Sequence, residues 1–234
     1  MSLCDNIIYG GFTMNKYILI AVVLIGTFLV HHFLTKFLVK KYTYKLMGSI
    51  TKDEESFVKE LDSFMVKYLF PVYNREFFRL NYYIINIQHA KVKEQFAKIE
   101  QIKMTNNQHL ALYQTVFKYF VSVNKKTDAK NLLRKINAFI DENNLDPEIK
   151  KQYEMEYKIY LEKDIKAIPY IDSLLENCED VEKAVHYLEK TYIYKENNQL
   201  DLAKECMQQV ITYTPDDKQK QAFQELLDNN LKDL

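Results

Sequence analysis

The side chains best suited to catalysis or metal binding are few and scattered in this sequence. Beyond residue 50 the histidines are His89, His109 and His186, and no two of them stand at metal-ligand spacing. Neither HExxH nor GxSxG occurs, and no Ser, His and Asp lie in a strand–turn–helix context. The sequence therefore predicts no catalytic residue, no metal ligand and no cofactor.

The three cysteines, Cys4, Cys178 and Cys206, form no CxxC motif, which indicates a reducing compartment. Cys178 and Cys206 either meet on neighbouring helices as a disulfide or metal pair, or are two small buried apolar side chains. Isolated cysteines at apolar helix positions usually belong to the second kind. We therefore expect two unpaired thiols.

Glycine is confined to the start of the chain, at positions 10, 11, 26 and 48. Phosphate-binding loops and dinucleotide turns need glycine so that the backbone can approach the ligand. Neither a P-loop nor a Rossmann fingerprint can therefore exist beyond residue 50. Because tight hairpins also depend on glycine, residues 52–234 are predicted to be all-α.

The 32 basic and 32 acidic residues balance, but they are unevenly distributed. Residues 1–50 hold five Lys and one Asp, which leaves 27 basic and 31 acidic residues in the rest of the chain. Nucleic-acid binding depends mainly on Lys and Arg that neutralise phosphates. The mildly acidic remainder thus gives no reason to expect a nucleic-acid partner.

A run of 19 residues without a formal charge separates Lys16 from Lys36, and apolar residues continue to Val39. Such a run fits a helix that crosses a hydrocarbon core of about 30 Å. We predict a transmembrane helix over 17–39, after a short leader at 1–16 and before a basic juxtamembrane linker at 40–51. A cleaved signal peptide is the alternative, but HHFLTKFLVKK stands where small residues should precede cleavage.

Basic residues predict how this single-pass protein lies in the membrane. Lys36, Lys40, Lys41 and Lys45 follow the span, whereas Lys16 alone precedes it. Because positive charge favours the cytoplasmic side, the C-terminal domain is expected there. Met14, followed by Asn and Lys, is a second possible start of translation.

From about residue 52 the sequence predicts short amphipathic helices, separated by Asn, Asp or Pro. Asn adopts the left-handed conformation that closes a helix, and so replaces the missing Gly. Asp and Thr then cap the next helix. The predicted breaks are 70–71, 105–107, 124–127, 143–147, 163–164, 177–180, 197–198 and 214–217.

One segment, Ala184–Asp217, carries a distinctive pattern. One small residue, Ala203, stands among larger aromatic and apolar residues at Tyr187, Tyr194, Leu200, Met207 and Val210, and Pro215 closes the segment. This pattern resembles the tetratricopeptide repeat, a helix pair in which a small residue lets the second helix approach the first. The resemblance implies an α-solenoid of antiparallel helix pairs with a binding groove.

Earlier helix pairs resemble the same repeat more loosely. Ala167, Ala129 and Ala90 occupy comparable places, at separations of 36, 38 and 39 residues. Residues 52–88 are predicted to be a degenerate first repeat or an N-terminal cap. Pro169 is expected early in a helix that starts near Asp164. The sequence departs from the family pattern at three positions where a small residue is expected, which hold Val116, Met155 and Thr191. The final helix, with Phe223, Leu226, Leu227 and Leu231 on one face, is expected to cap the array.

In the tetratricopeptide family the first helix of each pair lines the groove. The resemblance therefore predicts a partner-binding groove with a mixed, aromatic lining and no basic cluster for a C-terminal carboxylate. Its predicted residues are Gln114, Lys118, Gln152, Glu156, Tyr160, Val185, Leu188, Tyr192 and Lys195, with Ala111 and Ile149 beside them.

Three hypotheses for the function follow. The first is a membrane-tethered adaptor that binds a protein or peptide partner in this groove and the lipid bilayer through residues 17–39. The second is a structural membrane protein that self-associates as a homo-oligomer through its aromatic N-terminal helices. The third, an enzyme with an unrecognised helical site, has no residues to support it.

Overall fold

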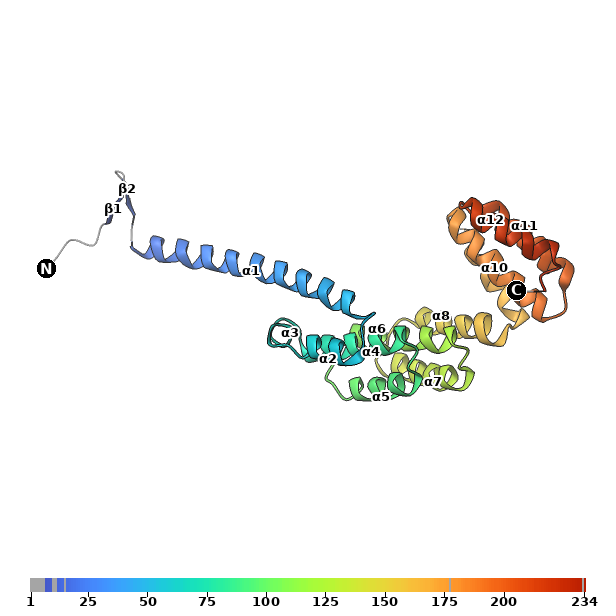
Figure 1. Ribbon diagram of the computed structural model, residues 1–234, viewed down its shortest axis with the longest axis horizontal. Helices are drawn as coiled ribbons and strands as arrows, with labels where there is room; N and C mark the ends of the chain where they lie inside the picture. The colour runs from blue at the N-terminus through green and yellow to red at the C-terminus, as the bar shows by residue number, and fades with distance from the viewer. Residues whose placement is uncertain (1–6, 10–11, 15, 177, 233) are drawn as a thin grey trace. The chain divides into compact units, whose positions relative to one another are not determined.

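The computed structural model describes residues 7–9, 12–14, 16–176, 178–232 and 234, with side chains described at residue 28 and from residue 31 onward. The chain divides into two compact units, Met1–Met104 and Thr105–Leu234, which share the predicted domain 52–234 between them. Apart from one two-stranded hairpin, the regular structure of the described residues is helical (Figure 1). The prediction of an all-α fold is thus confirmed.

The hairpin lies in the predicted leader. Strands β1 (Ile7–Tyr9) and β2 (Phe12–Met14) pair in an antiparallel register, with Ile7 opposite Met14. The helices of the first unit follow: α1 (Lys16–Ser49), α2 (Glu54–Leu61), α3 (Phe64–Leu69), α4 (Val72–Ile85) and α5 (His89–Ile99).

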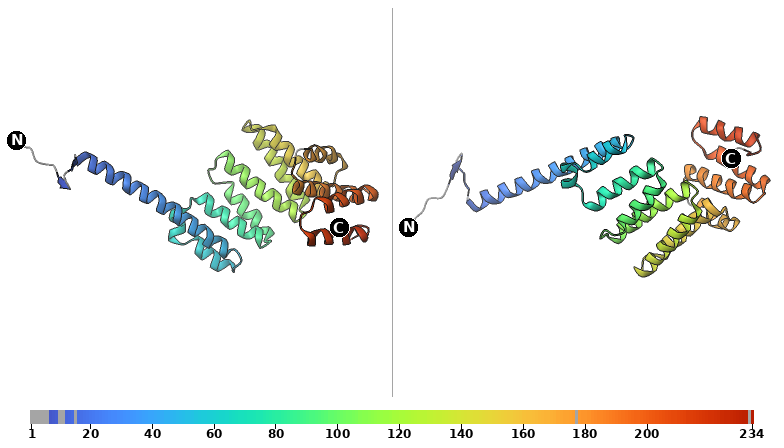
Figure 2. Two further views of the ribbon diagram at one scale, coloured as in Figure 1. Left: turned by 90° about the horizontal axis from the view of Figure 1, so that it is seen from above. Right: turned by 60° about the horizontal axis from the view of Figure 1, so that its bottom comes forward.

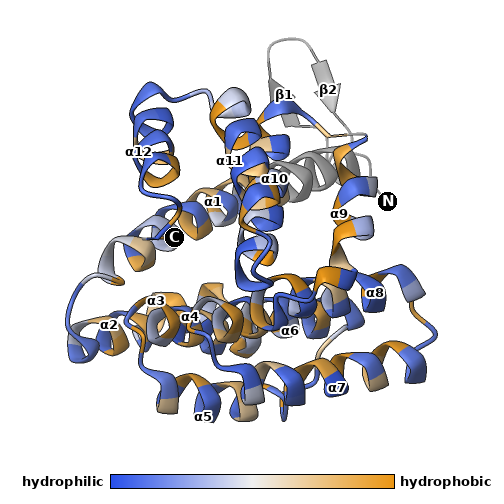
Figure 3. Cartoon of the chain, turned by 90° about the vertical axis from the view of Figure 1, so that its right-hand side faces the viewer, coloured by the Kyte–Doolittle hydropathy of each residue, from blue (hydrophilic) through white to orange (hydrophobic). Residues whose placement is uncertain are grey.

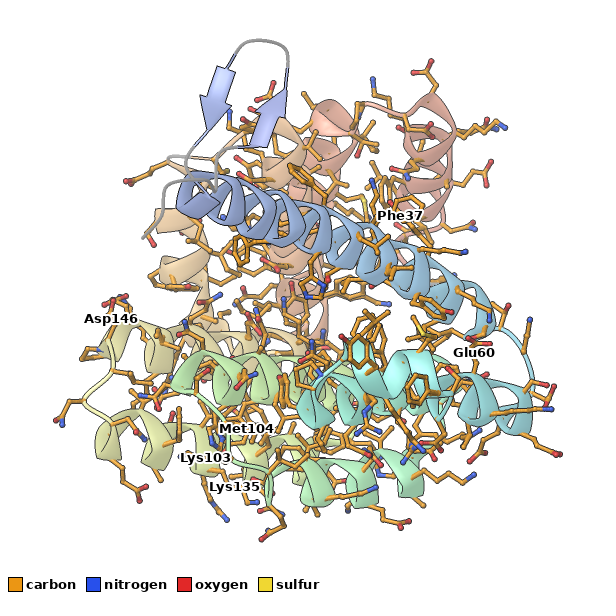
Figure 4. All side chains as sticks on the ribbon, turned by 90° about the vertical axis from the view of Figure 1, so that its left-hand side faces the viewer. Phe37, Glu60, Lys103, Met104, Lys135 and Asp146 are labelled. Atoms are coloured by element: carbon orange, nitrogen blue, oxygen red, sulfur yellow. The ribbon has the colours of Figure 1, made fainter. Side chains whose placement is uncertain are left out.

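Helix α1 runs without interruption for 34 residues, through the predicted span 17–39 and on through most of the predicted linker 40–51 (Figure 2). Within the part of the chain that the structure describes, no helix combines the length and the apolarity needed to cross a membrane. Most side chains of the predicted span lie outside the described residues. The C-terminal end of α1 packs on α2, where Lys45 Nζ lies 2.7 Å from Glu60 Oε1 (Glu60 is labelled in Figure 4).

The core of the first unit gathers apolar side chains from α2, α4 and α5. The rings of Phe57 and Tyr82 stack with centroids 4.5 Å apart. In the same unit the carboxylate of Glu76, 8% exposed, accepts hydrogen bonds from Gln95 Nε2 at 2.8 Å and Lys98 Nζ at 3.0 Å. Arg79 completes this set at 3.2 Å. The Glu76 carboxylate thus has three donors, as a buried carboxylate requires.

The second unit consists of helix pairs. Consecutive helices contact one another and are joined by short turns, so neighbours run antiparallel. The elements are α6 (Asn106–Ser122), α7 (Lys126–Glu142), α8 (Pro147–Tyr157), the π-helix η1 (Lys158–Glu162), the 3₁₀-helix η2 (Ile165–Ala167), α9 (Ile168–Leu175), α10 (Asp180–Glu196), α11 (Leu200–Tyr213) and α12 (Asp217–Asp228).

Side chains rather than glycines fix where these helices begin. Thr105 and Gln108 form a reciprocal capping box at the start of α6, with N···O distances of 3.3 and 2.9 Å. Asp146, labelled in Figure 4, accepts a hydrogen bond from the Glu148 amide at 2.9 Å and precedes Pro147 at the start of α8.

Asparagines in the left-handed conformation end the helices, as the sequence predicts. Asn124, Asn144, Asn198 and Asn230 have φ between 50° and 60°. At Asn198 the amides of residues 198 and 199 donate to the carbonyls of residues 195 and 194, the bonding pattern of a Schellman cap. The same pattern ends α4, but there Ile87 occupies the left-handed position with φ 52°.

Three helix boundaries of the sequence prediction are wrong, and one of them is the break at residues 86–88 between α4 and α5, which was not predicted. The helix expected to start near Asp164 starts instead at Ile168, because Lys163 has φ 54° and Asp164 caps the short 3₁₀-helix η2. The continuous helix expected before Pro71 breaks at residues 62–63, which separate α2 from α3. Ser63 supplies no side-chain cap there, so the break leaves no strong signal in the sequence.

The small residues of the repeat pattern lie at close contacts. Ala129, Ala167 and Ala203 are fully buried, whereas Ala90 on α5 is exposed and does not have this role. Buried residues recur at helical spacing along α7, which shows alternating orange and blue surfaces in Figure 3. Around Ala203 the apolar cluster of the C-terminal cap includes Met207, Val210, Leu231, Tyr187, Tyr194, Phe223, Leu226 and Leu227.

Candidate functional site

A pocket of about 340 Å³ opens between α6 and α8. Both helices run antiparallel to α7, so they run parallel to each other and present their residues in the same order. Tyr153, 6% exposed, closes the floor, and its ring meets Phe117 edge to face at 5.3 Å. The lining combines polar and apolar side chains: Asn107, Leu110, Ala111, Gln114, Ile149, Gln152, Tyr153 and Glu156.

Five of these lining residues belong to the groove predicted from sequence. The structure brings together Ala111 and Gln114 from α6 with Ile149, Gln152 and Glu156 from α8. Thr105 and Asp146 cap the two helices at their N-termini and so fix where each one begins.

Glu156 is the carboxylate of the pocket lining. Burial raises its pKa above the ordinary value, and the charge of Glu189 adds to that effect, whereas Lys118 and Gln152 oppose it. Among the described residues Glu156 has no salt bridge, and Gln152 Nε2 lies 3.5 Å from its Oε1. Burial together with the Glu156 charge raises the pKa of Tyr153 to about 12.

A second polar cluster connects η1 to α10. The hydroxyl of Tyr160 donates a hydrogen bond to Oε1 of Glu189, a residue 8% exposed. His186 Nδ1 lies 2.9 Å from the other carboxylate oxygen of Glu189. Burial is the first cause that raises the pKa of Tyr160, followed by the hydrogen bond and charge of Glu189 and the charge of Glu156.

One helical turn further along the same two elements, Lys163 Nζ lies 4.9 Å above the centre of the Tyr192 ring. Burial lowers the pKa of Lys163, while the charges of Glu196 and Glu189 act in the opposite direction. Asn197 Nδ2 donates to the Lys163 carbonyl at 2.8 Å. These contacts hold the π-helix and the left-handed turn against α10.

The other predicted groove residues lie elsewhere in the second unit. Val185 and Leu188 line a smaller pocket of about 120 Å³ between α10, α11 and α12, and Leu188 also packs on the cap cluster around Ala203. Lys118 is exposed on α6 beyond the α6–α8 pocket. Lys195 is half-buried near the end of α10. The residues of the predicted groove therefore do not line one continuous pocket in the second unit.

Sequence analysis missed Glu189 and His186 as members of this region. Their spacing could have indicated this: His186 and Glu189 precede the buried Ile193 by seven and four residues, so the three share one helix face. That face of α10 points inward and carries a carboxylate. It also missed Lys163, because no sequence pattern marks a π-helix or a lysine in the left-handed conformation. Cys178 and Cys206 are unpaired, and burial raises the pKa of Cys206.

No model of a known protein family matches the chain, and neither a curated protein nor a solved structure matches it. The tetratricopeptide resemblance therefore stays a prediction from the residues that carry it. Within the described ranges, no three His, Cys, Asp or Glu side chains lie close enough together to hold a metal ion.

Proposed function

We propose that this chain is a membrane-tethered adaptor whose second unit binds an extended peptide of a partner protein. The observation that carries the proposal is the pocket between α6 and α8, which collects Gln114, Gln152 and Glu156 in one half-polar cavity. Ligand sites are typically concave and largely apolar, with a few polar groups that fix orientation. Binding rather than catalysis is proposed, since no nucleophile adjoins a base in this cavity.

The arrangement of helices supports a solenoid like that of tetratricopeptide repeats. Helix α6 pairs with α7 and α10 pairs with α11, and α12 packs on the last pair. Between them, α8 and η1 share an apolar cluster with α9 that includes Met155, Ile159, Ile168 and Ile171. Each second helix begins at or near a fully buried alanine, at positions 129, 167 and 203. In such arrays the first helices line one face, where a partner binds.

The uncharged run between Lys16 and Lys36 supports a membrane tether formed by residues 17–39 of α1, with the C-terminal unit in the cytoplasm. We expect the full chain to stay in the membrane pellet after carbonate extraction, and a variant with Leu24→Lys and Gly26→Lys to be released. Protease treatment of intact cells tests the orientation. Digestion of the C-terminal unit from outside would contradict a cytoplasmic location.

Photo-crosslinking tests the groove. A photoreactive amino acid at Gln114 or Gln152, both exposed at the pocket, should yield a discrete crosslinked partner in cells. The matched control positions are Lys130 and Ala138, which are exposed on α7 and do not line the pocket. Equal crosslinking at the control and pocket positions would refute binding in the groove.

Self-association is the second candidate, because the first unit exposes large apolar side chains. Phe64, Tyr68 and Val72 are 80%, 66% and 51% exposed on α3 and α4. Exposed apolar patches mark interaction surfaces in soluble and peripheral proteins. Sedimentation of the detergent-solubilised full chain distinguishes the candidates: a concentration-dependent oligomer that Phe64→Ser and Tyr68→Ser abolish would favour self-association.

A further inference from the structure

Two carboxylates of this chain, the buried Glu76 and the half-buried Glu156, have opposite environments. Glu76 in the first unit is surrounded by Gln95, Lys98 and Arg79; burial alone would raise its pKa, but these partners lower it below the ordinary value. Glu156 in the pocket has only the distant amide of Gln152, at 3.5 Å. A carboxylate that loses water without gaining donors destabilises the folded chain. Glu156 therefore has unused capacity to accept hydrogen bonds from a cation.

The amides around Glu156 are also unoccupied. Asn107 and Gln114 are exposed at the pocket and make no side-chain hydrogen bond among the described residues. Each amide side chain carries both a donor and an acceptor, as does each peptide unit of a main chain. A row of such amides beside one carboxylate suits an extended peptide that carries one positive side chain.

We propose that the pocket between α6 and α8 binds a Lys or Arg side chain of an extended peptide, with the carboxylate of Glu156 as its counter-ion and the amides of Gln114 and Gln152 on the peptide main chain. This inference rests on the proposed function and names the chemistry of the partner at that site.

The charges around the pocket favour a cation over an anion. The charge of Glu189 adds negative potential at Glu156. Lys118 is the opposing cation, but it forms no salt bridge among the described residues, so its charge acts without direct contact. Tyr153 lines the same pocket, so an incoming cation meets an aromatic side chain as well as the carboxylate.

The experiment selects peptides from a display library of random nine-residue sequences against the detergent-solubilised full chain. Selection on the wild-type chain, with counter-selection on a Gln114→Ala, Gln152→Ala variant, isolates peptides that need the groove. We expect these peptides to share a Lys or Arg at one fixed position. Replacement of an enriched Arg by citrulline, which has the same shape without the charge, should weaken binding about tenfold or more.

A thermodynamic cycle then assigns the cation to its counter-ion. Glu156→Gln keeps the shape and removes the charge, so it should weaken the Arg peptide about tenfold and leave the citrulline peptide nearly unchanged. Lys118→Gln should strengthen the Arg peptide severalfold, because it removes the competing cation. Glu148→Gln is the matched control on α8: this carboxylate is 73% exposed in a surface pair with Lys151, and its loss should not change the affinity.

The outcomes separate the two proposals. Groove-dependent peptides with no basic position, or with an acidic one, overturn the basic partner and leave the peptide groove standing. Equal losses from citrulline in wild-type and Glu156→Gln chains overturn Glu156 as the counter-ion, and with it the proposal. Failure to recover any groove-dependent peptide overturns the groove and the basic partner together. A gain of affinity in Lys118→Gln provides a readout that no loss of folding can imitate.

Discussion

The hydrogen bond from Tyr160 to Glu189 is expected to contribute to the free energy that holds η1 on α10. Tyr160→Phe removes the hydroxyl and keeps the ring, so it isolates this bond. A hydrogen bond to a charged group contributes about 1.5–3 kcal/mol. Because Tyr160 is 40% exposed, water replaces part of the lost contact, whereas Glu189, at 8% exposure, keeps His186 as a partner and has little access to water. We therefore expect a loss of about 1–2 kcal/mol.

Native-state hydrogen exchange measures this loss where it acts. A change of about 1–2 kcal/mol accelerates exchange of the α10 amides by roughly 5- to 30-fold. Tyr192→Phe on α10 is the matched control, since the Tyr192 hydroxyl makes no hydrogen bond among the described residues and the ring beneath Lys163 is retained. If both variants exchange at the same rate, the bond does not hold η1 on α10, and the reasoning fails.

Three further perturbations have defined signs. Ile87→Asn should stabilise the first unit by about 0.5–1 kcal/mol in thermal unfolding, because a left-handed β-branched residue is strained by about 1–2 kcal/mol and this side chain is 70% exposed. Ala203→Leu should destabilise the second unit by about 1–3 kcal/mol by overpacking, whereas Ala90→Leu on the exposed side of α5 should be neutral. Because the pKa of Glu156 is raised in the folded state, ionisation of its carboxyl group disfavours folding. Its favourable contribution to the free energy of unfolding is therefore present at acid pH and lost as pH rises. Glu156→Gln should therefore unfold at a higher temperature than the wild type above pH about 7 and at the same temperature below pH about 4; a difference of the same size at both pH values would contradict the assignment.

Sequence reasoning succeeded where short-range chemistry decides the structure. The all-α fold followed from the absence of glycine beyond residue 48, and the helix ends followed from capping residues such as Thr105 and Asp146. Asparagine takes the left-handed position at four helix ends, as its short polar side chain allows. These features depend on a few neighbouring residues, and they are therefore readable from one sequence.

The same reasoning failed where distant packing decides. Lys163 and Ile87 adopt left-handed conformations that their own types disfavour, so tertiary contacts must hold them there. Ala90 matches the repeat spacing but lies on the exposed side of α5, because Val92 and Phe96 supply the buried side of that helix. Spacing predicts which residues share a helix face, and only the packed structure shows which face is covered.

The position of Glu156, a half-buried carboxylate with no salt bridge among the described residues, gives the strongest reason to regard the α6–α8 pocket as more than a gap between helices. A chain that surrounds Glu76 with three donors can satisfy a buried carboxylate, and four polar side chains line this pocket, yet Glu156 is left with one distant amide. Residues that reduce stability while facing a cavity are those expected at binding sites, where a ligand completes the missing contacts. If Glu156→Gln stabilises the chain and also removes binding of a basic peptide, one substitution will show that this residue lowers stability and is required for binding.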